Sequence, residues 1–275
     1  MSSAVKIYYR ISDQSYEKPK LPGASKTVCL YNCLKAFPND PIRVIADRCR
    51  PETVEWIKHF GMPCHETDLG NAGSMKYALQ LAKDNRDDTI CYFVEDDYLH
   101  REGADVVLRE GFTVAEYVTL YDHPDKYTRQ YRNGEISQVR RTPHSHWRYT
   151  LSTCMTFAMR AEFLRHDWAI LDRYTDGQHP NDHQLFCDLN GSMRRVGVAI
   201  PGYACHTDLT FSGAAGRMLI EEWAIELMNR QLDQDIDNFQ DEQLSAIKAR
   251  VIDKMPAGWD KLKMQDSLLK AMKLH

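Results

Sequence analysis

Three consecutive acids, Glu95, Asp96 and Asp97, follow the apolar run 91–94 of the sequence. A carboxylate removed from water is costly unless a positive charge meets it, so acids at the end of an apolar strand need a cation. Carboxylate oxygens suit Mg²⁺ or Mn²⁺, and these ions also accept phosphate oxygens as ligands. The acids therefore predict a divalent cation beside a phosphate. The alternative is that they only cap a helix or form a turn.

Polar residues at three other places could bind the same ligand. They follow two further strand-like segments or open a segment with helical spacing: Arg10, Ser12, Asp13, Asp47, Arg48, Asn71, Gly73 and Lys76. An Asn beside glycines at a helix start lets a phosphate approach backbone N–H groups, and Lys76 could meet the phosphate charge. Taken singly, each signal is typical of a capped turn. Their convergence on one edge of a sheet is the argument for a site.

The elements that must position these residues alternate between strand and helix. We predict strands over 4–11, 41–47 and 89–95, a short strand within 62–68, and helices over 27–37, 51–61 and 71–84. Strands that are apolar on both faces and separated by helices indicate a mainly parallel sheet covered by helices. Ligands of such sheets bind beyond the carboxyl ends of the strands. The polar residues named above fall at these ends.

The second half of the chain is less regular. Residues 122–150 are polar, and Asn-Gly within 132–135 predicts a tight hairpin. Basic and aromatic side chains interleave there: Lys126, Tyr127, Arg129, Tyr131, Arg132, Arg140, Arg141, Trp147, Arg148 and Tyr149. Cations meet phosphates and aromatic rings stack on sugars or bases, so the segment favours a polyanionic acceptor, with a solvated hairpin as the alternative. For His144 and His146 we favour a solvated loop over metal ligands.

The composition describes a soluble globular chain of 275 residues with a net charge of −4. This charge does not suggest a protein that coats nucleic acid. No apolar run approaches the roughly 20 residues needed to span a bilayer, and the N-terminus lacks a secretory layout. None of the eight cysteines forms a CxxC pair, which favours reduced thiols and a cytoplasmic location. We expect an α/β domain over 1–212 and a helical C-terminal extension over 213–275, which could form a homodimer.

The order of these motifs resembles that of the GT-A glycosyltransferases, which use nucleotide-diphospho sugars. The similarity covers about residues 4–210 and rests on KIYYRISD, IAD, GNAGSMKYAL, VEDDY, PNDHQLF and GYACHTD. It implies a GT-A fold, a Rossmann-like and mostly parallel sheet flanked by helices. The predicted helical C-terminal segment lies outside the similarity. It also implies that the acidic motif holds a divalent cation on the donor diphosphate. Here the first acid is Glu95 rather than Asp, which leaves its role open.

The resemblance assigns roles to single residues. The cation, Mn²⁺ or Mg²⁺, would bind Asp97 and His206, and a general base would be Asp182, with Asn181 in place of the usual preceding acid. The remaining roles are contacts to the nucleotide sugar: Glu95 or Asp96 supports the ribose or the outer shell of the metal, Asp47 contacts the base or ribose, and Arg10, Asn71 and Lys76 lie nearer the phosphates. The alternatives are that Asp182 caps its helix and that His206 belongs to the core.

The function implied is a metal-dependent, inverting glycosyltransferase that moves a sugar from a nucleotide-diphosphate donor to an acceptor hydroxyl. Two other classes stay open. One is a metal-dependent nucleotidyltransferase or sugar-nucleotide hydrolase, which shares the acids and the phosphate-binding turn. The other is a non-catalytic module that binds a glycan or a nucleotide. The acceptor is unspecified, and a glycan or a modified nucleic acid fits the basic segment.

Overall fold

A computed structural model describes residues 3–14, 20–21, 23–127, 137–208, 223–224 and 226–227. The predicted hairpin at 132–135 lies outside these residues, and so does nearly all of the predicted extension 213–275. No helix within the described ranges combines the length and apolar character that crossing a membrane demands.

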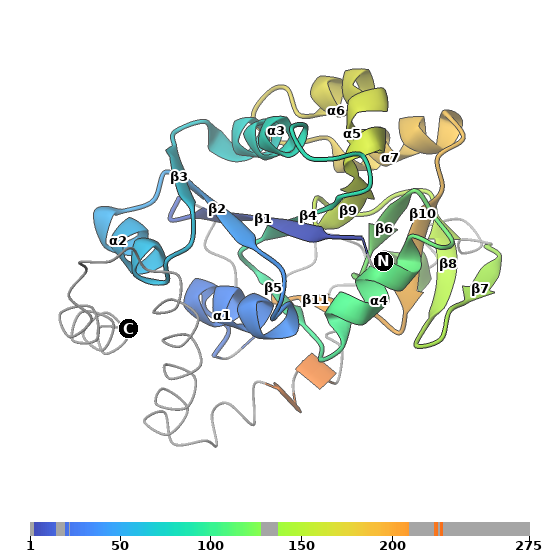
Figure 1. The fold of residues 1–275 in the computed structure, drawn as a ribbon, viewed down its shortest axis with the longest axis horizontal. Coiled ribbons are helices and arrows are strands. Elements are labelled where there is room, and N and C mark those ends of the chain that lie inside the picture. The colour runs from blue at the N-terminus through green and yellow to red at the C-terminus, as the bar shows by residue number, and fades with distance from the viewer. Residues whose placement is uncertain are drawn as a thin grey trace.

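The sheet of the described chain has nine strands in the order β3-β2-β1-β4-β9-β6-β10-β8-β7 (Figure 1). Their bounds are β1 (Val5–Ser12), β2 (Ile42–Asp47), β3 (Cys64–Thr67), β4 (Ile90–Glu95), β6 (Tyr117–Thr119), β7 (Val139–Arg141), β8 (His146–Thr150), β9 (Phe157–Arg160) and β10 (Val196–Ile200). Parallel pairing joins β3, β2, β1 and β4, and also joins β6 and β10. Only β9 and β8 run against the other strands. The predicted fold class, α/β with a mostly parallel sheet, is confirmed.

Helices cover both faces of this sheet (Figure 1). On one face lie α1 (Lys26–Ala36), α2 (Pro51–His59) and α4 (Ala104–Gly111), and on the other α3 (Gly70–Ala82), α5 (Ala161–His166), α6 (Trp168–Tyr174) and α7 (Asp182–Gly191). Successive side chains of a strand point to opposite faces, so each strand serves both cores. In β1, Ile7 and Tyr9 pack in the first core and Tyr8 in the second.

Two shorter elements complete the site. Strands β5 (Tyr98–His100) and β11 (Ala204–His206) form a separate antiparallel pair in which His206 lies opposite Tyr98. This pairing brings the end of the β11 segment beside the acidic motif that directly precedes β5. A short 3-10 helix, η1 (Pro124–Tyr127), begins the basic segment.

A substitution at Gly111, the last residue of α4, tests the packing between this helix and the sheet. A Cβ added at Gly111 would lie 2.6 Å from Cη2 of Trp147 and 2.7 Å from Cγ1 of Val118, and Trp147 is fully buried. We expect Gly111→Ala to lower the free energy of unfolding by about 1–3 kcal/mol, because overpacking forces neighbours from their places. Urea denaturation measures this change.

Gly191 supplies the matched control, because it is the last residue of α7 and a Cβ there meets nothing within 4 Å. We expect Gly191→Ala to be neutral or to stabilise the protein by about 0.5–1 kcal/mol. Equal free energies of unfolding for the two variants would contradict this account of the α4 packing.

Candidate functional site

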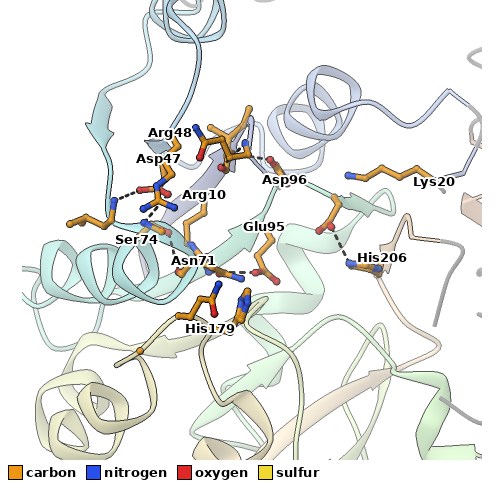
Figure 2. A pocket seen from close by; sticks show the side chains of 18 residues that line it. Arg10, Lys20, Asp47, Arg48, Asn71, Ser74, Glu95, Asp96, His179 and His206 are labelled. Atoms are coloured by element: carbon orange, nitrogen blue, oxygen red, sulfur yellow. Dashed lines mark hydrogen bonds and ion pairs between the residues drawn. The ribbon is translucent and has the colours of Figure 1, made fainter. Parts of the chain in front are cut away.

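A cleft of about 510 Å³ lies over the carboxyl ends of β1, β2 and β4 (Figure 2). This volume falls in the range of small-ligand sites. The parallel register explains the convergence, because it sets Arg10 opposite Glu95 and Ser12 opposite Asp47. Nine of the thirteen residues predicted for the site line the cleft: Arg10, Ser12, Asp47, Arg48, Asn71, Glu95, Asp96, Asp97 and His206. Asp13, Gly73, Lys76 and Asp182 do not.

Each acid of the motif meets a different cation, and the three cations come from three different elements. The pairs are Glu95 with Arg10 of β1, Asp96 with Lys26 of α1, and Asp97 with His206 of β11. The positive charge that the buried acids need is thus supplied by the chain itself. The sequence predicted Arg10 and His206 at this edge but not Lys26.

Arg10 joins the acidic motif to the first turn of α3. Its Nη1 lies 3.4 Å from Oε1 of Glu95, and its Nη2 donates to the backbone carbonyl of Asn71 at 2.9 Å and to the Asn71 side-chain oxygen. Burial raises the pKa of Glu95 to about 7, with Arg10 opposing and the charge of Asp97 adding to this rise. Burial and the charge of Asp97 therefore favour the protonated form of Glu95 more than water does, and a ligand charge placed beside it shifts that balance.

Asp96 fastens the end of β4 to the turn after β1. Its Oδ2 accepts the backbone N–H of Ser12 at 3.0 Å and lies 3.9 Å from Nζ of Lys26. Lys26 also donates to the Ser12 carbonyl, so both residues hold the same turn. Burial and then Asp97 raise the pKa of Asp96 to about 6, although Lys26 lowers it. Asp96 thus shapes the cleft from a buried position.

Asp97 and His206 form the predicted metal pair, with Oδ2 and Nε2 separated by 3.1 Å. The backbone N–H of Thr207 donates to the Asp97 carbonyl at 2.8 Å, which fixes the two segments together. Burial alone lowers the pKa of His206, but the charge and hydrogen bond of Asp97 outweigh it, and the pKa is raised.

This pair can be tested as a metal site from its geometry. Two ligands that sit at right angles about 2.0–2.2 Å from one octahedral ion are about 3 Å apart, so the 3.1 Å separation fits. Within the described ranges no group of three His, Cys, Asp or Glu side chains could hold a metal. Water and phosphate oxygens would have to complete the shell, as is usual for Mg²⁺.

The tautomer of His206 sets one condition on metal binding. Its Nδ1 accepts the backbone N–H of Asp208 at 3.3 Å, so in the neutral ring the hydrogen sits on Nε2. A metal ion can bind Nε2 only if this nitrogen loses its hydrogen. The neutral ring then carries its hydrogen on Nδ1, which breaks the 3.3 Å contact with the N–H of Asp208. A metal-binding histidine usually donates a hydrogen bond from the nitrogen that does not bind the metal. In His206 this nitrogen is Nδ1, and it faces the backbone N–H of Asp208, which is itself a donor.

Asp47 lines the cleft but its carboxylate is bonded to the β3–α3 turn. Oδ1 accepts from Oγ1 of Thr67 at 2.9 Å and from the N–H of Leu69 at 2.7 Å, and Oδ2 accepts the N–H of Gly70 at 3.1 Å. A helix N-terminus attracts an anion, and here that anion is Asp47. At the expected phosphate cradle, Asp47 thus takes the N–H groups of Leu69 and Gly70, and the Gln178 carbonyl accepts that of Ala72.

Two more predicted phosphate contacts of α3 lie away from the cleft. Nζ of Lys76 lies 3.0 Å from Oδ1 of Asp172 and 3.4 Å from Oδ1 of Asp176, so its charge is met by the α6 region. A Cβ at Gly73 would lie 2.8 Å from Cβ of Leu69, so this glycine permits close packing of the helix start. The sequence pattern placed both residues near the phosphates because it could not show which residues of α3 face the cleft, as Asn71 and Ser74 do.

Asp182, the predicted base, is the first residue of α7. Asn181 is the N-cap, and its side chain accepts the N–H of Gln184 at 3.2 Å, so Asp182 is not the cap. Burial raises the pKa of Asp182 despite the N–H of His183, which donates to its Oδ1 at 2.7 Å. Burial thus outweighs the helix N-terminus. Asp182 lies outside the cleft lining, yet its charge contributes, after burial and nearer charges, to the raised pKa of Glu95.

Sequence reasoning missed several residues that line the cleft: Gln14, Lys20, Ser74, Gly177, Gln178 and His179. The last three belong to the α6–α7 loop, whose Gln178 carbonyl accepts the N–H of Ala72 at 3.4 Å. The dipeptide 176–177, Asp-Gly, is a turn signal, and Gly177 has a φ of 98°. That signal, directly before the PNDHQLF motif, could have identified this loop as a wall of the site.

The described residues of the basic segment do not form one surface. Lys126 and Arg148 are buried, and Arg148 lies 2.6 Å from Asp122. Arg140 and Arg141 are exposed on β7, while Arg129, Tyr131 and Arg132 lie outside the described residues. Trp147 belongs to the core. His144 lies 2.6 Å from Glu110, an ordinary surface pair.

No protein-family model and no curated protein matches the chain. Solved structures with a similar fold include the galactosyltransferase LgtC in complex with donor and acceptor sugar analogs (11% identity, TM-score 0.46, 82% of this chain and 94% of that chain). Others are S. aureus TarS 1–349 (11%, 0.46, 98% and 71%) and a nucleotidyl transferase from Methanothermobacter thermautotroptrophicus (12%, 0.44, 71% and 87%).

By their descriptions, these neighbours include a galactosyltransferase and a nucleotidyl transferase. Their identities and TM-scores are too low to identify an activity. The fold class therefore rests on the strand order and pairing described above, and the activity is argued from the site alone.

Proposed function

We propose that the protein is a glycosyltransferase that moves a sugar from a nucleotide-diphosphate donor to an acceptor hydroxyl. The observation that carries this proposal is the Asp97–His206 pair, 3.1 Å apart within a cleft of about 510 Å³ at the carboxyl ends of the parallel strands. Acids and cations alternate there, which suits a ligand with phosphates, ribose and sugar hydroxyls. A Mn²⁺ or Mg²⁺ ion held by Asp97 and His206 would neutralise charge on the diphosphate.

The donor contacts follow from the cleft lining. Arg10 and Asn71 lie on the β1–α3 side and bind phosphate or ribose oxygens, and Ser12 lies at the turn that Asp96 holds. Glu95 lines the cleft, and its carboxyl oxygens accept hydrogen bonds from hydroxyl groups of the donor. Asp47 acts indirectly, by holding the turn before Asn71 in place.

Asp182 favours glycosyl transfer over nucleotidyl transfer. The nucleophile of a nucleotidyltransferase is commonly a phosphate, which is already anionic near pH 7 and needs no base. A sugar hydroxyl is a poor nucleophile and gains from a positioned carboxylate. Asp182 is a carboxylate next to the cleft whose burial raises its pKa, and so its strength as a base.

The proposed step conserves atoms and charge. The acceptor oxygen forms a bond to the anomeric carbon while its proton passes to a carboxylate oxygen of Asp182. The bond from the anomeric carbon to the terminal phosphate oxygen breaks, and its electron pair leaves with the nucleoside diphosphate. Attack from the face opposite the leaving group inverts the anomeric configuration.

For the acceptor, the described part of the basic segment supports a sugar ring more than a polyanion. Tyr127 is 61% exposed, yet its hydroxyl donates to Oδ2 of Asp122 at 2.5 Å and its ring lies 5.7 Å from the Arg148 guanidinium. A fixed, exposed aromatic ring is a stacking surface for a sugar. The neighbouring Lys126 donates to Ser152 at 2.8 Å, and Ser152 also contacts His183 beside the proposed base.

All eight cysteines are free thiols, in keeping with the proposed cytoplasmic location.

Calorimetry with UDP, GDP, ADP, CDP and TDP, each with and without Mn²⁺, tests the proposed function. We expect one of them to bind with a Kd in the micromolar range, more tightly with Mn²⁺, because the cleft combines cations with a metal pair. Product analysis with the matching sugar nucleotide then separates the classes. A released nucleoside diphosphate with a new glycoside supports transfer, whereas pyrophosphate or free sugar supports one of the alternatives. No binding to any of the five would refute the proposal.

A further inference from the structure

Lys20 is a cation in the cleft that has no role in the proposed function described so far. It lines the cleft, and Figure 2 shows its side chain extending from the side of His206 toward Asp96. Arg10, Lys26 and His206 each lie against one acid of the motif. Within the described ranges the Lys20 ammonium has no hydrogen bond or ion pair of this kind.

The backbone around Lys20 is fixed to the metal pair. Lys20 forms an antiparallel bridge with Asp208, and the N–H of Leu21 donates to the Thr207 carbonyl at 2.8 Å. Thr207 in turn donates to the carbonyl of Asp97 at 2.8 Å. Three chain segments that are distant in the sequence therefore lie side by side, and the position of Lys20 is coupled to that of Asp97 and His206.

The charge of Lys20 acts inside the cleft. The pKa of Asp96 is raised by burial and by Asp97, and Lys20 is among the groups that lower it. The ammonium is therefore within electrostatic range of the acidic motif while staying beyond hydrogen-bond distance. A cation held in a cleft in this way is available to an anionic ligand.

We propose that Lys20 binds the terminal phosphate of the donor diphosphate and stabilises it as the leaving group. This inference rests on the proposed function. Lys20 lies on the Asp97–His206 side of the cleft, whereas Arg10 and Asn71 lie on the β1–α3 side (Figure 2). A diphosphate that spans the cleft places its terminal phosphate between Lys20 and the metal pair.

The chemistry gives this contact a catalytic effect as well as a binding effect. When the bond to the anomeric carbon breaks, the electron pair stays on the terminal phosphate oxygen, which gains negative charge. A cation that is already in position stabilises this charge more strongly in the transition state than in the bound donor. The backbone bridge at Lys20 fixes the point from which the ammonium reaches the phosphate.

Lys20→Met tests the inference by calorimetry with the nucleoside diphosphate that the wild-type protein binds, the matching monophosphate and the free nucleoside. We expect the variant to bind the diphosphate at least about tenfold more weakly, the size expected for one charge-assisted hydrogen bond. Affinity for the nucleoside should change less than about twofold, since Lys20 does not contact it. Lys20→Arg should retain most of the diphosphate affinity, because it keeps the charge.

Lys58→Met is the matched control. Lys58 lies on α2, 2.5 Å from Glu66 and outside the cleft lining, so its loss should change none of the three affinities. Unchanged diphosphate affinity in Lys20→Met would refute the inference and leave the proposed function standing. An equal loss for nucleoside and diphosphate would also refute it, because Lys20 would then only hold the shape of the cleft. If the wild-type protein binds no nucleotide, both the inference and the proposed function are refuted.

Discussion

Asp182→Asn is expected to lower kcat by about 10²–10⁴-fold while leaving the affinity for the donor nearly unchanged. The substitution keeps the shape of the side chain but removes the oxygen that takes the acceptor proton. Asp182 lies outside the cleft lining, so the donor contacts remain. Steady-state kinetics with the acceptor, together with calorimetry of the donor nucleotide, separates the two effects.

The pH profile of kcat supplies a second readout for Asp182. Burial raises the pKa of this carboxyl above its ordinary value of 3.8. The base must be ionised to accept a proton, so the wild-type rate should rise with pH through that raised pKa and then level off. In Asp182→Asn this acidic limb should disappear from the residual activity.

Asp188→Asn is a suitable control on the same helix. Asp188 accepts hydrogen bonds from Tyr174 at 2.6 Å and from Gln184 at 2.9 Å, away from the cleft lining, so kcat should stay near the wild-type value. A near-normal kcat in Asp182→Asn would remove Asp182 from the role of base. A product that retains the anomeric configuration would do the same, because retention does not use a base opposite the leaving group.

The first half of the fold could be predicted because its pattern is local. Strands β1, β2 and β4 are mostly apolar, and the helices between them begin or end at proline or glycine signals. Parallel strands bring their carboxyl ends to one edge, so Arg10, Asp47 and the acidic motif could be placed together without knowing any contact.

The inserted strand β9 could not be predicted, because its place depends on contacts between distant residues. It runs antiparallel between β4 and β6, with Phe157 opposite Phe93 and Met159 opposite Tyr117. The sequence around β9 shows a strand, but nothing in it specifies the partner or the direction. The same holds for the pairing of β11 with β5, which brings His206 to the acidic motif.

The roles of single polar residues were harder to predict than their positions. Asp47 is at the expected edge, yet its oxygens accept the N–H groups of the β3–α3 turn. Lys76 is on the expected helix, yet its charge is met by Asp172 and Asp176. A sequence shows which side chains follow a strand, but a hydrogen bond depends on the partner that arrives from elsewhere in the chain.

Asp97→Ala is expected to weaken Mn²⁺ binding by at least about 100-fold and to remove metal-dependent turnover. Loss of a partner in the outer shell already costs about 10–100-fold in metal affinity, and a ligand should cost at least as much. Mn²⁺ affinity, measured by calorimetry with the nucleoside diphosphate present, gives a readout that does not depend on activity. Asp88→Asn, an exposed acid paired with Arg86, should keep both the affinity and the turnover, because neither residue of this pair lines the cleft.

The same substitution tests whether the acids and cations of the cleft act as one charge system. The charge of Asp97 adds to the burial that raises the pKa values of Glu95 and Asp96, and it opposes the burial that lowers the pKa of His206. Its removal should therefore lower all three pKa values, and NMR titration of His206 can follow one of them directly. Turnover that persists in excess chelator, or a variant that binds Mn²⁺ as well as the wild type, would exclude Asp97 as a ligand. In that case the His206–Asp97 contact is an ion pair that supports the cleft, and the charge on the diphosphate must be met by Lys20 and Arg10.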